Sequence, residues 1–159
     1  MMALTGHTGK IGSIILNHYN CVKGFSRSNG YDIRSEQDRI IEESKSCNVF
    51  INCAHGGPGF AQTELFWKIF NEWINTNKII INIGSEKADY NIWSKIRKGY
   101  CSEKSALAAA VEEAQTQQHK CKVSIINPYI VNKCVQKDLI TAIDFCINSN
   151  SEIKLINLQ

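Results

Sequence analysis

Six short runs of branched and other apolar residues recur along the chain, each bounded by Gly, Asn, Ser or Pro as β-strands usually are. The predicted strands are residues 2–4, 21–25, 48–53, 78–83, 122–126 and 153–158. The segments between them carry apolar residues at helical spacing, such as Leu107, Val111 and Ala114. Helices that alternate with strands in this way predict βα units and a parallel sheet.

The central runs 49–51 and 79–81 are almost continuously apolar, which is typical of strands covered on both faces. We therefore predict an α/β, doubly wound fold with a mostly parallel sheet of about six to seven strands and helices on both faces. Residues 31–33 are predicted to form a very short extra strand, reached by a loop and followed by a helix around residues 36–44. The whole chain, residues 1–159, is predicted to be a single domain.

A glycine-rich loop follows the first predicted strand and opens the first predicted helix. Residues 5–12 read Thr-Gly-His-Thr-Gly-Lys-Ile-Gly. Glycine lets a backbone turn tightly and approach a pyrophosphate, whose charge then meets the N–H groups at the helix N-terminus. The spacing is GxxGxxG rather than the GxGxxG of many dinucleotide-binding enzymes. Its position predicts a Rossmann NAD(P)-binding domain, the alternative being a structural turn. The predicted cofactor contacts here are Gly6, His7, Thr8, Gly9, Lys10, Ile11 and Gly12.

The end of the second predicted strand indicates which cofactor is bound. NAD enzymes usually place Asp or Glu there, about twenty residues after the first glycine, on the ribose hydroxyls. This chain instead has Ser26, Arg27 and Ser28, with no carboxylate to repel a 2′-phosphate and an arginine that could bind one. We therefore predict NADP(H) in preference to NAD(H), with Asp32 and Ile33 near the adenine. The alternative is that Arg27 is a solvated turn residue.

A tyrosine and a lysine four residues apart suggest proton-transfer chemistry. The pattern occurs three times, with the tyrosine at position 19, 100 or 129, but only Tyr100 and Lys104 stand together on one predicted helix. Residues at i and i+4 share a helical face. An ammonium beside a phenol favours the phenolate, so the tyrosine could exchange a proton with a carbonyl or alcohol oxygen near neutral pH.

Taken in order, these motifs resemble the short-chain dehydrogenase/reductase family over nearly the whole chain. The matching segments are residues 5–12, Asn52-Cys53-Ala54-His55-Gly56, Ile83-Gly84-Ser85, Tyr100 with Lys104, and Asn127-Pro128. Cys53, His55 and Tyr129 depart from the family pattern. No single motif is specific, but five in the right order on the right predicted elements are.

The resemblance implies hydride transfer between a nicotinamide and a small-molecule carbonyl or alcohol substrate. Tyr100 would be the general acid/base, Lys104 would hold the ribose, and Ser85 would hydrogen-bond the substrate oxygen. Ser85 as a turn cap and Lys104 as a solvated helix residue remain alternatives. Further cofactor contacts implied by the family motifs are Asn52, Cys53, Ala54, His55, Gly56, Tyr100, Lys104, Pro128, Tyr129, Ile130 and Val131.

Two features favour a different function, a non-catalytic NADP(H)-binding sensor or interaction module that retains the fold. Only a few residues separate Pro128 from the last predicted helix, where family members usually insert a substrate lid. Many members also use an asparagine on the helix before the strand that corresponds to residues 78–83, which we cannot place in this chain. The segment 86–99, with Tyr90, Ile92 and Trp93, is the best candidate for what remains of a substrate wall.

An aromatic stripe on the third long predicted helix has two explanations. Phe66, Trp67, Phe70 and Trp73 recur at helical spacing. Core packing explains them most simply. In the family, however, this helix and the Tyr-Lys helix commonly form a dimer interface, which exposed aromatics would serve. The resemblance therefore implies a homodimer.

The composition bears on the class of protein and its cellular compartment, but it does not indicate a reaction. The chain has 43% hydrophobic and 21% charged residues, and its net charge of +3 comes from scattered basic residues. We therefore expect a globular protein with no nucleic-acid partner. The seven cysteines form no CxxC pair, which favours reduced thiols and gives a metal site no support. We see no secretory signal and no apolar run long enough to span a membrane, so we expect a cytoplasmic protein.

Overall fold

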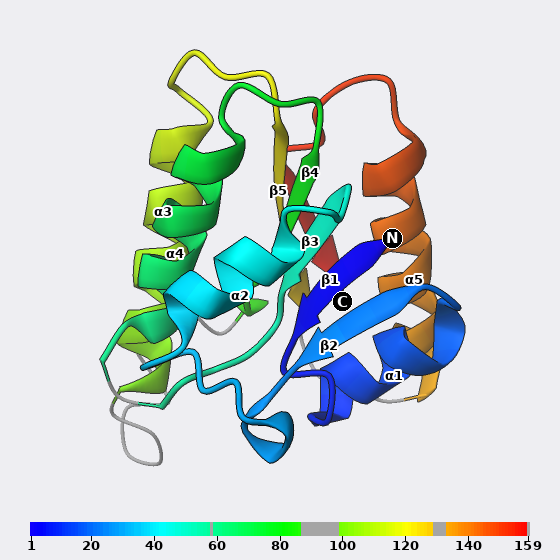
Figure 1. Ribbon diagram of the computed structural model, residues 1–159. Helices are drawn as coiled ribbons and strands as arrows, with labels where there is room; N and C mark the ends of the chain where they lie inside the picture. Colours follow the sequence, from blue (N-terminus) through cyan, green and yellow to red (C-terminus); the bar gives the residue numbers. More distant parts are fainter. Residues whose placement is uncertain (58, 87–98, 129–132, 159) are drawn as a thin grey trace.

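A single parallel sheet organises the molecule, in the strand order β2-β1-β3-β4-β5-β6 (Figure 1). The computed structural model describes residues 1–57, 59–86, 99–128 and 133–158. The strands in this part are β1 (Met2–Thr5), β2 (Val22–Phe25), β3 (Val49–Asn52), β4 (Ile79–Ile83), β5 (Lys122–Pro128) and β6 (Leu155–Leu158). Every neighbouring pair is parallel. The predicted doubly wound α/β fold is confirmed.

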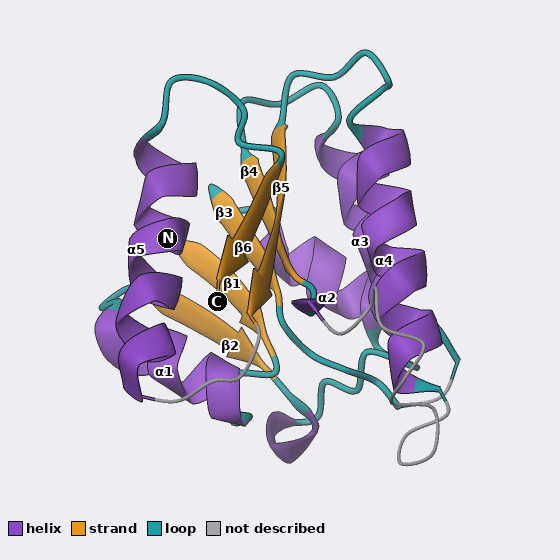
Figure 2. Cartoon of the chain, turned by 180° about the vertical axis from the view of Figure 1, so that it is seen from behind, coloured by secondary structure: helices purple, strands orange, loops and turns teal. Residues whose placement is uncertain are grey.

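Helices cover the sheet on both faces, as the apolar central strands predict. They are α1 (Lys10–His18), α2 (Gln37–Ser44), α3 (Ala61–Trp73), α4 (Tyr100–Ala114) and α5 (Lys133–Asn148). α2, α3 and α4 lie on one face, and α1 and α5 lie on the other, as Figures 1 and 2 show from opposite sides. A short 3-10 helix, Arg27–Asn29, follows β2.

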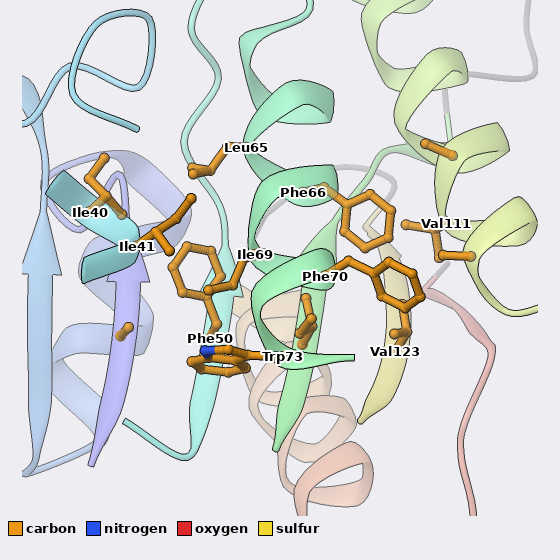
Figure 3. Close-up of a cluster of buried hydrophobic side chains, with 14 of the residues drawn as sticks. Ile40, Ile41, Phe50, Leu65, Phe66, Ile69, Phe70, Trp73, Val111 and Val123 are labelled. Carbon is orange, nitrogen blue, oxygen red and sulfur yellow. The ribbon is translucent and has the colours of Figure 1, made fainter. Parts of the chain in front are cut away.

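The two faces of the sheet have different cores because successive strand residues point to opposite sides. Along β3, Phe50 packs toward α2, α3 and α4, whereas Val49 and Ile51 pack toward α1 and α5. The first core is rich in aromatic rings and is drawn in Figure 3. The second core is built mainly from aliphatic side chains, including Ile15 and Ile143.

The aromatic stripe of α3 belongs to the first core. Phe66 and Phe70 are fully buried and Trp73 is 1% exposed, while Trp67 is partly buried against the same cluster. The core interpretation is therefore confirmed. These rings are not the exposed aromatics that a dimer interface would use, so the stripe gives the predicted homodimer no support.

The prediction of a short strand at residues 31–33 is wrong, because these residues form their hydrogen bonds locally rather than with a neighbouring strand. The carbonyl oxygen of Asp32 accepts the N–H groups of Ser35 and Glu36. The carboxylate of Asp32 also accepts the backbone N–H of Arg34, at 3.0 Å. Such side-chain bonds to nearby backbone favour turns over ladder pairing. The helix predicted after this segment is confirmed as α2.

Three further features bear on the sequence predictions. None of the helices in the described ranges is long and apolar enough to cross a membrane. The six cysteines whose side chains are described are free thiols. Over the same residues, no three His, Cys, Asp or Glu side chains gather as metal ligands would.

Candidate functional site: a cavity lined by a glycine loop and a Tyr-Lys pair

A cavity of about 670 Å³ lies at the carboxyl ends of β1, β2, β3 and β4. β1 lies between β2 and β3. The chain adds β2 on one side of β1 and then crosses over to add β3 and the later strands on the other side. Doubly wound sheets bind their ligands at such a switch point. The lining residues are Gly6, Thr8, Gly9, Lys10, Ile11, Gly12, Ser26, Arg27, Ser28, Tyr31, Asp32, Ile33, Cys53, Ala54, His55, Gly56, Ile83, Gly84, Tyr100 and Lys104.

The glycine loop forms the wall between β1 and α1, and its glycines are required by its shape. Gly6 has a φ of +69°, which L side chains rarely adopt. A Cβ on Gly12 would overlap the carbonyl oxygen of Gly6. The first turn of α1 has N–H groups without intrahelical partners and carries no acidic residue. The loop therefore fits a pyrophosphate, as the sequence predicts.

The end of β2 places charges of both signs in the cavity. Arg27 is exposed there, beside the hydroxyl groups of Ser26 and Ser28, which lie 2.7 Å apart. The turn at residue 32 also brings Asp32, which the sequence analysis predicts near the adenine, into the same cavity, so a carboxylate lines it together with Arg27. Arg34 donates to this carboxylate at 2.6 Å, and these hydrogen bonds lower the pKa of Asp32 to about 2.

Tyr31 also lines this part of the cavity, although the sequence analysis did not include it among the contacts. The guanidinium of Arg39 lies 4.3 Å from the centre of its ring, and Phe25 meets the ring edge-on. Its hydroxyl donates to Glu43 at 2.7 Å, and this bond raises the pKa of Tyr31. The sequence could have indicated Tyr31 as a site residue, because it directly precedes Asp32 and Ile33, which are both predicted near the adenine.

At the other end of the cavity, Tyr100 and Lys104 lie on one face of α4, as their spacing predicts. The Lys104 Nζ is 5.8 Å from the centre of the Tyr100 ring. Lys104 is only 4% exposed and donates to Gln62 Oε1 at 2.8 Å and to the Ile83 carbonyl at 2.7 Å. Burial lowers the pKa of Lys104 to about 8. It is therefore not a solvated helix residue.

Gln62 is a site residue that the sequence analysis missed. It is buried near the start of α3, where its amide group donates to the carbonyls of Asn52 and Ile83 while its oxygen accepts from Lys104. It thereby connects the ends of β3 and β4 to the buried ammonium. The sequence could have indicated Gln62, because it is a polar residue on the apolar face of α3, in line with Phe66 and Trp73.

A second buried charge lies beside the Tyr-Lys pair. Glu103 is 7% exposed, and its Oε2 is 3.1 Å from Nδ1 of His55. The His55 ring meets the Tyr100 ring edge-on, with centroids 5.0 Å apart. Next to His55, burial raises the pKa of the Cys53 thiol to about 11, so this cysteine is no nucleophile at neutral pH.

Four predicted site residues do not line the cavity. The His7 ring packs over Gly24 on β2, in the space that a Cβ there would occupy. Asn52 points into the protein and donates to the Gln62 carbonyl and to Asn82 Oδ1. Ser85 and Pro128 are buried and are not among the lining residues. The predicted contacts Tyr129, Ile130 and Val131, and most of the predicted substrate wall at residues 86–99, lie outside the described residues.

Solved structures of dehydrogenases match this architecture, although no family model and no curated protein sequence matches the chain. A small-chain dehydrogenase aligns with a TM-score of 0.76 and 17% identity over 99% of this chain and 95% of its own. A 4-hydroxyisoleucine dehydrogenase complexed with NADH and succinate gives 0.76 and 16% over 100% and 97%. A short chain dehydrogenase from Burkholderia cenocepacia in complex with NADP gives 0.72 and 14% over 99% and 87%. The resemblance found in the motifs is thus confirmed in three dimensions: the chain has the fold of the short-chain dehydrogenases/reductases.

Proposed function

We propose that this protein is an NADP(H)-dependent oxidoreductase that transfers a hydride between the nicotinamide and a small carbonyl or alcohol substrate. The observation that carries the proposal is that the glycine loop, Arg27 and the Tyr100–Lys104 pair line one continuous cavity. Two of the similar structures were solved with NADH and with NADP, which supports a nicotinamide cofactor.

Each part of the cavity has a role in this reaction. The N–H groups at the start of α1 hold the pyrophosphate, and Arg27 binds the 2′-phosphate as a charge-assisted pair. The bound nicotinamide supplies or accepts the hydride. Tyr100 donates a proton to the substrate oxygen during reduction and takes it back during oxidation. Lys104 keeps a positive charge near the phenol and the ribose, whereas Ser85, which is buried outside the cavity lining, is given no part in the reaction.

The test separates binding from chemistry. Tryptophan fluorescence titrations with NADPH and NADH measure cofactor affinity, and we expect NADPH to bind more tightly. A panel of small aldehydes and ketones is then assayed with wild type and Tyr100→Phe, and we expect about 10²-fold or greater loss of turnover in the variant.

Tyr19→Phe is the matched control for this experiment. Tyr19 has a lysine four residues later as well, but its hydroxyl donates to Asp144 away from the cavity. We expect Tyr19→Phe to retain wild-type turnover. A protein that binds neither cofactor contradicts the proposal. NADPH binding with no Tyr100-dependent turnover across the panel supports the alternative of a nucleotide-binding module without catalysis.

A further inference from the structure

A carboxylate lines the cavity at the end where a 2′-phosphate would bind. Among the described residues of the lining, the single carboxylate is Asp32, and it lies at the same end as Arg27. A phosphate monoester carries a charge of about −1.5 to −2 at pH 7. A free carboxylate beside it would repel it, and NAD-binding enzymes place an acidic residue on the ribose at this point. Asp32 therefore opposes the NADP(H) preference that Arg27 favours, unless its charge is neutralised.

The backbone holds Asp32 next to the turn that carries Arg27. The short 3-10 helix begins at Arg27, and the N–H of Tyr31 donates back to the carbonyl of Ser26 at 2.9 Å. This bond closes the loop and returns the chain to the end of β2. The hydrogen bonds from Arg34 are the main cause of the lowered pKa of Asp32, and the charge of Arg27 contributes to it as well. The two charges of the lining are therefore close enough to interact.

Arg34 holds the Asp32 carboxylate with both its side chain and its backbone. Its Nε lies 3.1 and 3.2 Å from the two carboxylate oxygens, its Nη2 lies 2.6 Å from Oδ2, and its backbone N–H donates to Oδ1 at 3.0 Å. A guanidinium that donates to both oxygens neutralises the carboxylate and occupies lone pairs that ribose hydroxyls could otherwise use. Arg34 is not among the lining residues, so it acts on the cavity through Asp32.

The neighbouring cations are arranged differently. Arg39 and Lys23 both pair with Glu43, each at 3.1 Å, and neither lines the cavity. Arg27 is exposed, and within the described part of the chain no carboxylate forms an ion pair with it. The division of partners is thus specific: Arg34 takes the Asp32 carboxylate, and the guanidinium of Arg27 remains available for a phosphate.

We propose that Arg34 makes the cavity selective for NADP(H) by neutralising Asp32, so that the carboxylate does not repel the 2′-phosphate at Arg27. Arg34 is a positioning residue in this arrangement, because its effect on the cofactor passes through Asp32. Without Arg34, the free carboxylate would repel the 2′-phosphate and could accept the ribose hydroxyls of NAD(H). This inference rests on the cofactor-binding part of the proposed function and not on turnover.

A double-mutant cycle provides the central experiment. Fluorescence titrations with NADPH and NADH are made on wild type, Arg34→Gln, Asp32→Asn and the double variant. We expect Arg34→Gln to lose about tenfold in NADPH affinity and to keep its NADH affinity within about threefold, which also shows that it is folded. Asp32→Asn should bind NADPH at least as tightly as wild type, because asparagine carries no charge and still suits the turn.

The double variant separates neutralisation from the other roles that Arg34 could have. Removal of Asp32 takes away the repelling charge, so the double variant should recover NADPH affinity to within about twofold of wild type although Arg34 is absent. If Arg34 bound the phosphate directly or only maintained the loop, the double variant would stay as weak as Arg34→Gln.

Lys45→Gln is the matched control. Lys45 is 48% exposed and lies 2.6 Å from Glu42, whereas Arg34 is 53% exposed and lies 2.6 Å from Asp32, but the Lys45 pair lies outside the cavity. We expect Lys45→Gln to bind NADPH and NADH as wild type does. A tenfold loss of NADPH affinity in this control would show that any lost surface cation has the same effect, and would overturn the role of Arg34.

The outcomes distinguish this inference from the proposed function. Wild type that prefers NADPH, together with an unaffected Arg34→Gln or an unrecovered double variant, overturns the role of Arg34 alone. Wild type that binds neither cofactor, or that prefers NADH, overturns it together with the proposed NADP(H) preference. Selective loss in Arg34→Gln with recovery in the double variant supports the inference even where no substrate is turned over, because the cycle measures binding.

Discussion

The two ends of the cavity differ in how their charges are exposed to water: the proposed phosphate end, formed by the glycine loop and Arg27, and the proposed reacting end, formed by Tyr100 and Lys104. At the phosphate end, Arg27 and the Asp32–Arg34 pair are at least partly exposed to water, and backbone N–H groups complete the wall. At the reacting end, Lys104 and Glu103 are almost completely buried, and each has a specific polar partner.

In the proposed function, this difference separates cofactor binding from catalysis. Water screens charges at the phosphate end, so each interaction is modest, and a change there alters affinity without disturbing the fold. At the reacting end the low dielectric strengthens every interaction and shifts protonation, as the lowered pKa of Lys104 shows. We therefore expect changes at the reacting end to affect stability and turnover together.

Gln62→Leu should produce the largest effect on the free energy of unfolding. It removes the acceptor of the Lys104 ammonium and the donor to the Asn52 and Ile83 carbonyls, leaving a buried charge short of a partner. We expect a loss of about 3 kcal/mol or more, measured by urea denaturation. Gln115→Leu is the control, since Gln115 also bridges two carbonyls but in a partly exposed setting, and should lose about 1 kcal/mol. Equal losses would remove the distinction between buried and exposed networks.

Arg27→Ala should weaken NADPH binding without lowering turnover at saturating cofactor. Loss of a charge-assisted contact to the 2′-phosphate should reduce NADPH affinity by about 10- to 100-fold and leave NADH affinity nearly unchanged. Fluorescence titration measures both affinities. Lys68→Ala, at an exposed lysine paired with Asp38 outside the cavity, is the control and should change neither. An equal loss of NADPH and NADH affinity would contradict recognition of the 2′-phosphate.

The two ends also differ in how far the sequence predicts them. The phosphate end depends on one contiguous loop with its glycines at fixed spacing, so its residues could be recognised directly. The reacting end depends on partners far apart in the chain. Tyr100 and Lys104 could be recognised at helical spacing, but the Lys104 contact with Gln62 spans 42 residues and becomes visible only once α3 and α4 are packed together.

The failed predictions have similar physical causes. Periodicity predicted six strands close to their observed positions because each buries apolar residues, but it also predicted a strand at residues 31–33, where Asp32 holds a turn through its own backbone and side chain. Asn52 looked like a cofactor contact, yet it points toward Asn82 on β4, its directly paired neighbour in the sheet. Such orientations follow from the pairing of strands, which sequence motifs do not encode.

The pH dependence of turnover should report the buried lysine. Because burial lowers the pKa of Lys104 to about 8, its ammonium loses the proton above that pH. If the ammonium is needed next to Tyr100, turnover should fall about tenfold per pH unit above pH 8. Gln62→Glu places a carboxylate against Lys104 and should move this limb to higher pH. A limb that stays in place in Gln62→Glu contradicts its assignment to Lys104.

Asp32→Asn should have the smallest effect, because it removes an ion pair at the screened end of the cavity. The pKa of Asp32 is lowered to about 2 by the hydrogen bonds from Arg34, so the native state favours the carboxylate. Its stabilisation is therefore fully present above about pH 4 and is lost as the pH falls toward 2. We expect wild type to exceed Asp32→Asn by at most about 1 kcal/mol at pH 7, with the difference shrinking to zero at low pH, as measured by urea denaturation across that range. A difference of several kcal/mol at pH 7 would place Asp32 with the buried charges of the reacting end, and the contrast between the two ends would then fail at this residue.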